Sequence, residues 1–208
     1  MLQTQTIEPG TLSLLKSLMN VPSLRQSFLV GGTALSLKYG HRISIDLDLF
    51  YTDELDKAKI FEELHEIFRE NFDYRGNPNS FGIFCHIYNI KVDIIKYPHK
   101  MIHEPEIFDD IRIYHSDDIV AMKINAILGR GKKKDFWDIA ELTQHYSIGK
   151  MIELHQNKYP SQQLLISTPT ALTYFDDAND SEDPVSLKGQ TWESVKQTIS
   201  KAVREYLS

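Results

Sequence analysis

The chain of 208 residues contains one cysteine, Cys85, so it cannot build an internal disulfide framework. It has no apolar run near the ~20 residues that span a bilayer. Residues 1–10 lack the cationic and apolar regions of a signal peptide. These absences predict a cytoplasmic protein that does not associate with membranes.

Positive charge is also scarce. There are 23 Lys and Arg against 29 Asp and Glu, giving a formal net charge of -6. A protein that coats nucleic acid nonspecifically has the opposite sign, so any contact with RNA or DNA must be local. The 41% apolar and 25% charged residues are the balance of an ordinary globular protein.

Several common catalytic motifs are missing as well. The glycine- and lysine-rich residues 129–132 lack the spacing of a P-loop. His99 and His103 are four apart, but no partnering cysteine or carboxylate pattern accompanies them, so the eight histidines predict no zinc site. Serine and cysteine nucleophile motifs are absent too.

The first half of the chain reads as a mixed β-sheet with helices. Apolar spacing predicts a helix that ends near Asn20, and a strand, a glycine turn and a helix over residues 27–38. Strict alternation predicts a strand over residues 43–50. A helix over 55–71 and an antiparallel hairpin of 81–88 with 91–97 complete this part.

The second half is helical in character. Amphipathic patterns predict helices over 117–128, 134–146 and 192–207. The acidic region 171–189 reads as a loop, which either contacts a partner protein or is simply solvated. We therefore expect an α/β lobe over residues 1–100 and a mainly helical lobe over 101–208.

Three acidic residues suggest a metal site. In a strand, Asp46 and Asp48 share one face, while Ile45, Leu47 and Leu49 would pack behind them. Asp93 lies in a separate apolar strand. Hard oxygen ligands of this kind suit Mg²⁺ or Mn²⁺. Taken alone, an Asp-x-Asp pair is more often a solvated strand face.

Upstream, Gly31 and Gly32 lie where a strand gives way to a helix. Backbone N–H groups at such a helix N-terminus suit phosphate oxygens, although a plain turn is the common alternative. Arg42 and Ser44 would share the wet strand face with Asp46, either to contact phosphate or as a surface polar pair.

In the helical half, Lys123 and Arg130 are seven apart, so both would project from one helix face and could grip an anion. Two unrelated surface cations are the alternative. Asp135 and Asp138 share a face of the next helix, where Asp138 would hold Lys123 or Arg130 in position or form a structural salt bridge.

Residues 31–35 and 40–49, with Asp93 as a third carboxylate, resemble the nucleotidyltransferase core of the DNA polymerase beta superfamily in its AbiEii/AbiGii toxin form. Residues 130–138 and 172–177 also resemble that family. The resemblance implies an α+β fold, with a nucleotidyltransferase-like mixed sheet, flanking helices and a C-terminal helical lobe. It implies transfer of a nucleoside monophosphate from an NTP, with release of pyrophosphate and with Mg²⁺ or Mn²⁺ as cofactor.

The resemblance assigns roles by position. The metal ligands would be Asp46, Asp48 and Asp93, and the catalytic set would add Lys123 and Asp138. The nucleotide would contact Gly31, Gly32, Thr33, Arg42, Ser44, Lys123, Arg130, Lys134 and Asp135.

The same family implies a toxin of a toxin-antitoxin or phage-defence system, with an RNA such as tRNA, or a protein, as acceptor and a cognate antitoxin as partner. Two alternatives remain open at this point. One is a nucleotide- or partner-binding module without turnover, and the other is a transferase that modifies a small molecule.

Overall fold

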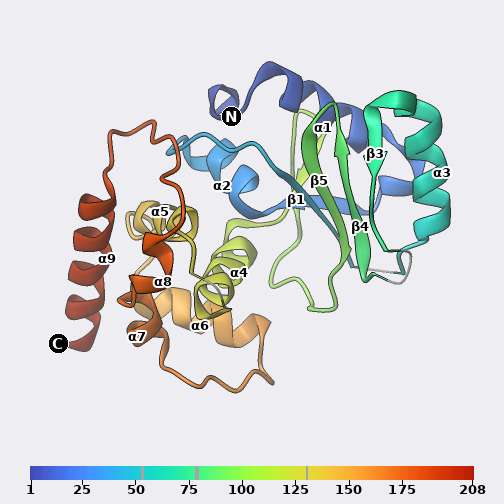
Figure 1. The fold of residues 1–208 in the computed structure, drawn as a ribbon. Coiled ribbons are helices and arrows are strands. Elements are labelled where there is room, and N and C mark those ends of the chain that lie inside the picture. Colours follow the sequence, from blue (N-terminus) through green and yellow to red (C-terminus); the bar gives the residue numbers. More distant parts are fainter. Residues whose placement is uncertain (53, 78–79, 130) are drawn as a thin grey trace.

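The structure is a computed structural model that describes residues 1–52, 54–77, 80–129 and 131–208. It is a mixed α/β structure in which the sheet and α3 lie on one side and α4 to α9 gather on the other (Figure 1). The expected fold class is confirmed. Among the described residues, no helix combines the length and the apolar character that a bilayer crossing requires.

The described strands form one seven-stranded sheet in the order β3-β4-β5-β2-β1-β7-β6. The strands are β1 (Ser27–Val30), β2 (Leu47–Tyr51), β3 (Phe72–Tyr74), β4 (Gly82–Ile87), β5 (Ile90–Lys96), β6 (Glu106–Phe108) and β7 (Ile111–Ile113). β2 pairs with β5 in parallel, and so does β1 with β7, while the other neighbours are antiparallel. The predicted hairpin is β4 and β5, joined through Tyr88 and Asn89, both at positive φ.

The helices cover the sheet and build the second half of the molecule. They are α1 (Pro9–Asn20), α2 (Gly31–Tyr39), α3 (Lys57–Phe68), α4 (Ser116–Gly129), α5 (Lys133–Leu142), α6 (Ile148–Lys158), α7 (Thr168–Leu172), α8 (Asp176–Asn179) and α9 (Trp192–Leu207). The helix expected over 192–207 is confirmed at both ends, and Thr191 caps it through the Ser194 backbone N–H.

Several sequence-based predictions need correction. The strand expected from residue 43 begins only at Leu47, and Ile45, expected in the core, is 62% exposed. α2 starts at Gly31 itself, without a separate turn, and α5 ends at Leu142. The acidic region expected to be a loop contains α8 and the end of α7.

The correction over residues 43–46 has a physical cause. Backbone N–H groups of Ile43 and Ser44 donate to the carbonyls of Val185 and Thr6, at 2.9 and 3.0 Å, and not to a neighbouring strand of the sheet. Arg42 and Ser44 point inward and are buried, which leaves Ile45 outside. The alternation is therefore real, but its polar residues face the interior.

Strands β6 and β7 lie beyond residue 100 and still join the sheet, through the pairing of Leu29 with Ile113. The short β3 and helix α6 were not expected from the sequence. α6 packs against α4, and α5 packs against α9. The proposed division into lobes at residue 100 stays a prediction.

Aromatic stacking holds α9 to the rest of the molecule. The rings of Trp137 on α5 and Trp192 on α9 lie 5.7 Å apart with planes 9° from parallel, and both side chains are buried. We expect Trp192→Ala to lower the free energy of unfolding by about 3–5 kcal/mol, because it leaves a large cavity. Urea denaturation would measure the change.

The matched control is Leu207→Ala on the same helix, since Leu207 is 67% exposed. This change should cost less than about 0.5 kcal/mol. Equal effects of the two substitutions would contradict the packing that we describe.

Candidate active site

The cavity

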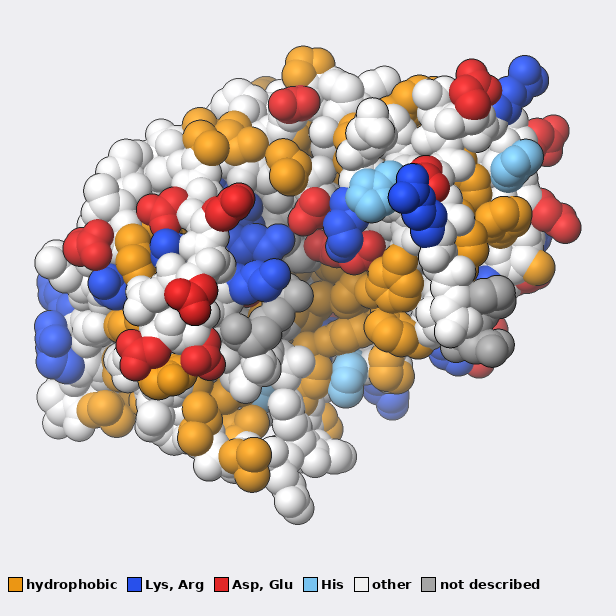
Figure 2. Space-filling model, in the orientation of Figure 1, with side chains coloured by type: hydrophobic (Ala, Val, Ile, Leu, Met, Phe, Trp, Pro, Cys, Tyr) orange, Lys and Arg blue, Asp and Glu red, His pale blue; other side chains and the backbone are white. Residues whose placement is uncertain are grey.

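A cavity of about 420 Å³ lies between the sheet and α4, α5 and the start of α2. Its lining includes most of the residues that the sequence singles out: Gly31, Gly32, Arg42, Ser44, Asp46, Asp48, Asp93, Lys123, Lys134 and Asp135. Figure 2 shows acidic and basic side chains meeting around a central hollow, with hydrophobic surface beside it. Of the other predicted site residues, Thr33 and Asp138 do not line the cavity, and Arg130 lies outside the described residues.

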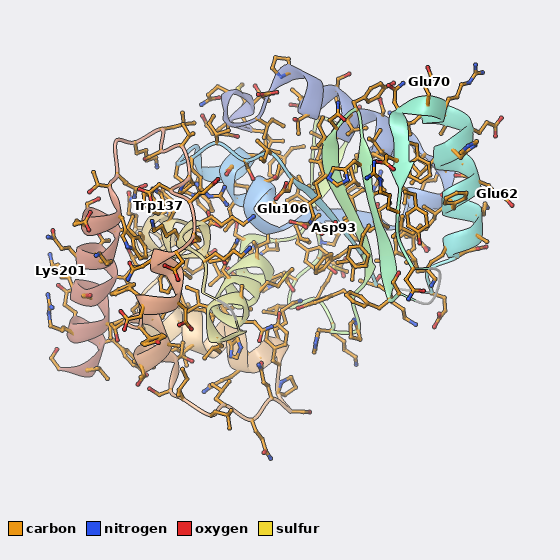
Figure 3. The ribbon with its side chains drawn as sticks, in the orientation of Figure 1. Glu62, Glu70, Asp93, Glu106, Trp137 and Lys201 are labelled. Atoms are coloured by element: carbon orange, nitrogen blue, oxygen red, sulfur yellow. The ribbon has the colours of Figure 1, made fainter. Side chains whose placement is uncertain are left out.

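Two of the three carboxylates face each other across adjacent strands. Asp48 on β2 and Asp93 on β5 are direct partners in the parallel register. Asp93 is 9% exposed, and Figure 3 shows it between the sheet and the helices. Burial first, and then the charge of Asp93, raise the pKa of Asp48 above its ordinary value.

Asp46 and Asp93 each have a lysine partner. Lys91 forms an ion pair with Asp93 Oδ2, while Asp93 Oδ1 is buried and has no hydrogen-bond partner among the described atoms. Lys134 Nζ lies 3.3 Å from Asp46 Oδ2. The three acidic groups do not form a set within 4.8 Å of one another in the described part of the chain.

The N-terminus of α2 approaches the acidic strand closely. Gly31 has φ +72°, and a Cβ there would come 2.5 Å from Asp48 Oδ2. A Cβ on Gly32 would overlap the guanidinium of Arg42. Glycine at both positions thus lets the backbone N–H groups reach the floor of the cavity.

Thr33 is buried behind this floor, and Ser44, also buried, lines the cavity. The Thr33 hydroxyl lies 2.8 Å from the Ser44 hydroxyl and also contacts the Asp46 carbonyl oxygen. Both hydroxyls therefore hold the segment before β2, which carries Asp46. A phosphate contact by either residue stays a prediction.

The buried charge network

Behind the cavity, Asp138 of α5 collects three cationic or polar donors. Arg42 Nε and His41 Nε2 each lie 2.7 Å from Asp138 Oδ1. Lys123 Nζ lies 2.7 Å from Oδ2 and 2.9 Å from Asp135 Oδ1. An ion pair of Asp138 with Lys123 is thus present, which fits both the positioning role and the structural salt bridge expected from the sequence, whereas His41 was not predicted as a member.

The electrostatics of the network favour the charged forms. Burial alone would raise the pKa of Asp138, but Arg42 and Lys123 hold it well below the ordinary range. The paired carboxylates likewise raise the pKa values of Arg42 and Lys123 against the effect of burial. Arg42, expected on a wet strand face, is instead 3% exposed.

Aromatic side chains that sequence reasoning missed line another part of the cavity. Phe50 and Tyr97 have ring centroids 4.6 Å apart, and Tyr159 meets the Tyr97 hydroxyl. Phe50 could have been found, because it lies two residues from Asp48 on the same strand face. Tyr159 carried no signal, since it follows the unexpected helix α6.

Comparison with known proteins

Residues 13–200 match the family described as nucleotidyl transferase AbiEii toxin of type IV toxin-antitoxin systems. The chain belongs to this family. It is also 31% identical over 186 residues to the uncharacterised protein aq_aa25 of Aquifex aeolicus, covering 86% of this chain and 87% of that protein. The resemblance seen in the sequence is confirmed, and the chain is a nucleotidyltransferase.

Solved structures share the fold at low sequence identity. JHP933 from Helicobacter pylori matches with a TM-score of 0.58 and 17% identity, over 96% of this chain and 92% of that one. MenT4, a nucleotidyltransferase toxin from Mycobacterium tuberculosis, matches with a TM-score of 0.51 and 12% identity, over 93% and 84%. These structures support the fold alone.

A test of the buried network

The network around Asp138 should dominate the stability of this region. Asp138→Asn leaves two buried cations with less compensation, so we expect the free energy of unfolding at pH 7 to fall by about 3–5 kcal/mol. Urea denaturation of both proteins would measure it.

The effect should depend on pH in one direction. The folded-state pKa of Asp138 lies below its unfolded value, so its stabilisation is complete above about pH 4 and is lost as the pH falls further. The gap between wild type and Asp138→Asn should therefore narrow below about pH 4. A constant gap from pH 7 to pH 3 would contradict this account.

Proposed function

We propose that this chain transfers a nucleoside monophosphate from an NTP to an RNA, such as tRNA, or to a protein. We further propose that it depends on Mg²⁺ or Mn²⁺ and acts in the cytoplasm as the toxin of a toxin-antitoxin or phage-defence system, opposed by a cognate antitoxin. The observation that carries the proposal is the pairing of Asp48 with Asp93 in one cavity with Asp46, beside a glycine-lined helix N-terminus.

The donor set fits a hard divalent cation. Asp46, Asp48 and Asp93 offer only carboxylate oxygens, which suit Mg²⁺ or Mn²⁺. The buried Asp93 Oδ1 has no partner among the described atoms, and the raised pKa of Asp48 marks a site that penalises uncompensated negative charge. A metal ion held there would neutralise the triphosphate and stabilise both the attacking and the leaving oxygens.

The chain's own residues would then bind the triphosphate. The backbone N–H groups of Gly31 and Gly32, at the first turn of the nine-residue α2, point the positive end of a helix dipole at the cavity. Lys134, whose side chain is 42% exposed, would exchange Asp46 for a phosphate oxygen. Lys123 has three donors and uses two on Asp135 and Asp138, which leaves one for a ligand.

The acceptor would approach along the sheet side of the cavity. Asp93 would orient the acceptor hydroxyl and accept its proton, a role for which a buried carboxylate on the cavity wall is suited. The rings of Phe50 and Tyr97 offer a face on which a nucleobase can stack. The division into a catalytic lobe over 1–100 and a helical lobe over 101–208 belongs to the same proposal.

We expect Asp48→Asn to lower NMP transfer from a labelled NTP by about 1000-fold or more, because the metal would lose a ligand that stabilises the transition state by several kcal/mol. Asp93→Asn should behave likewise. The Asp48→Asn substitution should not lower the free energy of unfolding of the metal-free chain, because the folded protein already disfavours the charged form of Asp48.

The control is Asp180→Asn, which changes one exposed carboxylate outside the cavity and should leave the rate unchanged. Pyrophosphate release and the free energy of unfolding would be measured on all variants. Retained transfer by Asp48→Asn in a preparation free of contaminating enzyme would refute the proposed site.

The acceptor and the metal can be tested together. Each of the four labelled NTPs would be incubated with separate pools of RNA, protein and small molecules, with EDTA or with added Mg²⁺ or Mn²⁺. We expect label on RNA or protein only, lost in EDTA and restored by the metal. Label on a small molecule would overturn the proposed acceptor class, and NTP binding without pyrophosphate release would favour a binding module.

A further inference from the structure

Two histidines and a carboxylate meet at the start of α4. The rings of His103 and His115 have centroids 4.6 Å apart. His103 Nε2 lies 3.0 Å from Asp117 Oδ2, and His115 Nδ1 lies 3.8 Å from Asp117 Oδ1. One ligand atom from each residue lies within 4.8 Å of the others, and none of the three lines the cavity of the active site.

We propose that His103, His115 and Asp117 bind a second divalent ion, of the Zn²⁺ class, independently of the catalytic cavity. Imidazole nitrogens suit Zn²⁺, whereas Mg²⁺ prefers oxygen ligands alone. Three protein ligands leave a fourth tetrahedral position for water. The side chains of His103 and His115 are 49% and 34% exposed, so a hydrated ion reaches them from solvent.

The surroundings hold these ligands in place. Asp118 accepts the backbone N–H groups of Ile102 and His103 at 2.9 and 3.1 Å, which fixes the loop that carries His103. Lys158 pairs with Asp118 at 2.6 Å, fully buried. Tyr146 donates its hydroxyl to Asp117 Oδ1 at 2.8 Å. Outer contacts of this kind orient metal ligands and raise affinity.

A hydrogen bond and the helix dipole of α4 also act on these ligands. His115 Nδ1 accepts the Asp117 backbone N–H at 3.2 Å, so its lone pair is engaged in this hydrogen bond, and a metal ion would bind His115 through Nε2 or replace the bond. The positive end of α4 opposes a cation, and the carboxylates of Asp117 and Asp118 in its first turn offset that effect.

The site would tie together two parts of the active-site wall. His103 lies in the segment that follows β5, the strand of Asp93, and Asp117 lies in α4, the helix of Lys123. An ion bound to both elements restrains their separation. We therefore assign the site a structural role in supporting the cavity rather than a role in the chemistry.

Zinc binding by the full-length protein, first stripped of metal with a chelator, tests the proposal. Competition with a chromophoric zinc chelator should give one equivalent of Zn²⁺ that is retained in Asp48→Asn. His103→Ala and His115→Ala should each weaken zinc affinity by about 100-fold. Removal of an outer-shell partner already costs about 10- to 100-fold, and loss of a ligand should cost at least as much. Co²⁺ should give the visible absorption of a tetrahedral site in the wild type and not in these variants.

The control is His65→Gln, an exposed histidine on α3 away from the cluster, which should leave zinc affinity unchanged. Because His103 is half-exposed, its removal leaves a folded chain, and thermal unfolding with and without Zn²⁺ gives a second readout. Equal zinc affinity in His103→Ala and the wild type would overturn the proposal, and so would loss of the bound Zn²⁺ in Asp48→Asn. The cluster would then be a simple ion pair between His103 and Asp117.

Discussion

The buried carboxylate of Asp138 is the interaction on which the site depends. It joins segments that are far apart in the sequence, because Arg42 precedes β2, Lys123 belongs to α4 and Asp138 belongs to α5. Burying these charges is costly, and removing any one of them would leave its partner uncompensated. The network therefore favours the observed arrangement of α4 and α5 against the segment before β2, beside which the cavity lies.

The pKa values of Asp138 and Asp48 are shifted in opposite directions. The pKa of Asp138 lies below its ordinary range because cations surround it, whereas that of Asp48 lies above because burial and Asp93 disfavour its charge. The first group stabilises the fold at neutral pH and the second does not. A destabilised carboxylate such as that of Asp48, next to the ion-paired network around Asp138, is typical of a functional site, where residues required for the reaction reduce the stability of the fold.

Much of the fold could be predicted from the sequence because its pattern is local. The hairpin of β4 and β5 and the helix α9 carry apolar spacing and end signals within their own residues. Residues 43–46 misled the prediction because alternation does not show which face is buried. Ser44 lies inside with Thr33 as its partner, and Ile45 lies outside. The three-residue strands β6 and β7 are too short to show a period.

The proposed roles within the site depend on contacts between distant segments, which a single sequence does not encode locally. The run of three lysines over residues 132–134, at the start of α5, illustrates this. Lys133 pairs with Asp183 at 2.7 Å, and Lys134 lies 3.3 Å from Asp46, so two of its positive charges are partly neutralised by the chain itself. With a net charge of -6, the protein has little long-range attraction for a polyanion. Recognition of an RNA acceptor would then rest on short-range contacts inside the cavity, where Phe50 and Tyr97 offer aromatic faces and Lys123 a buried charge.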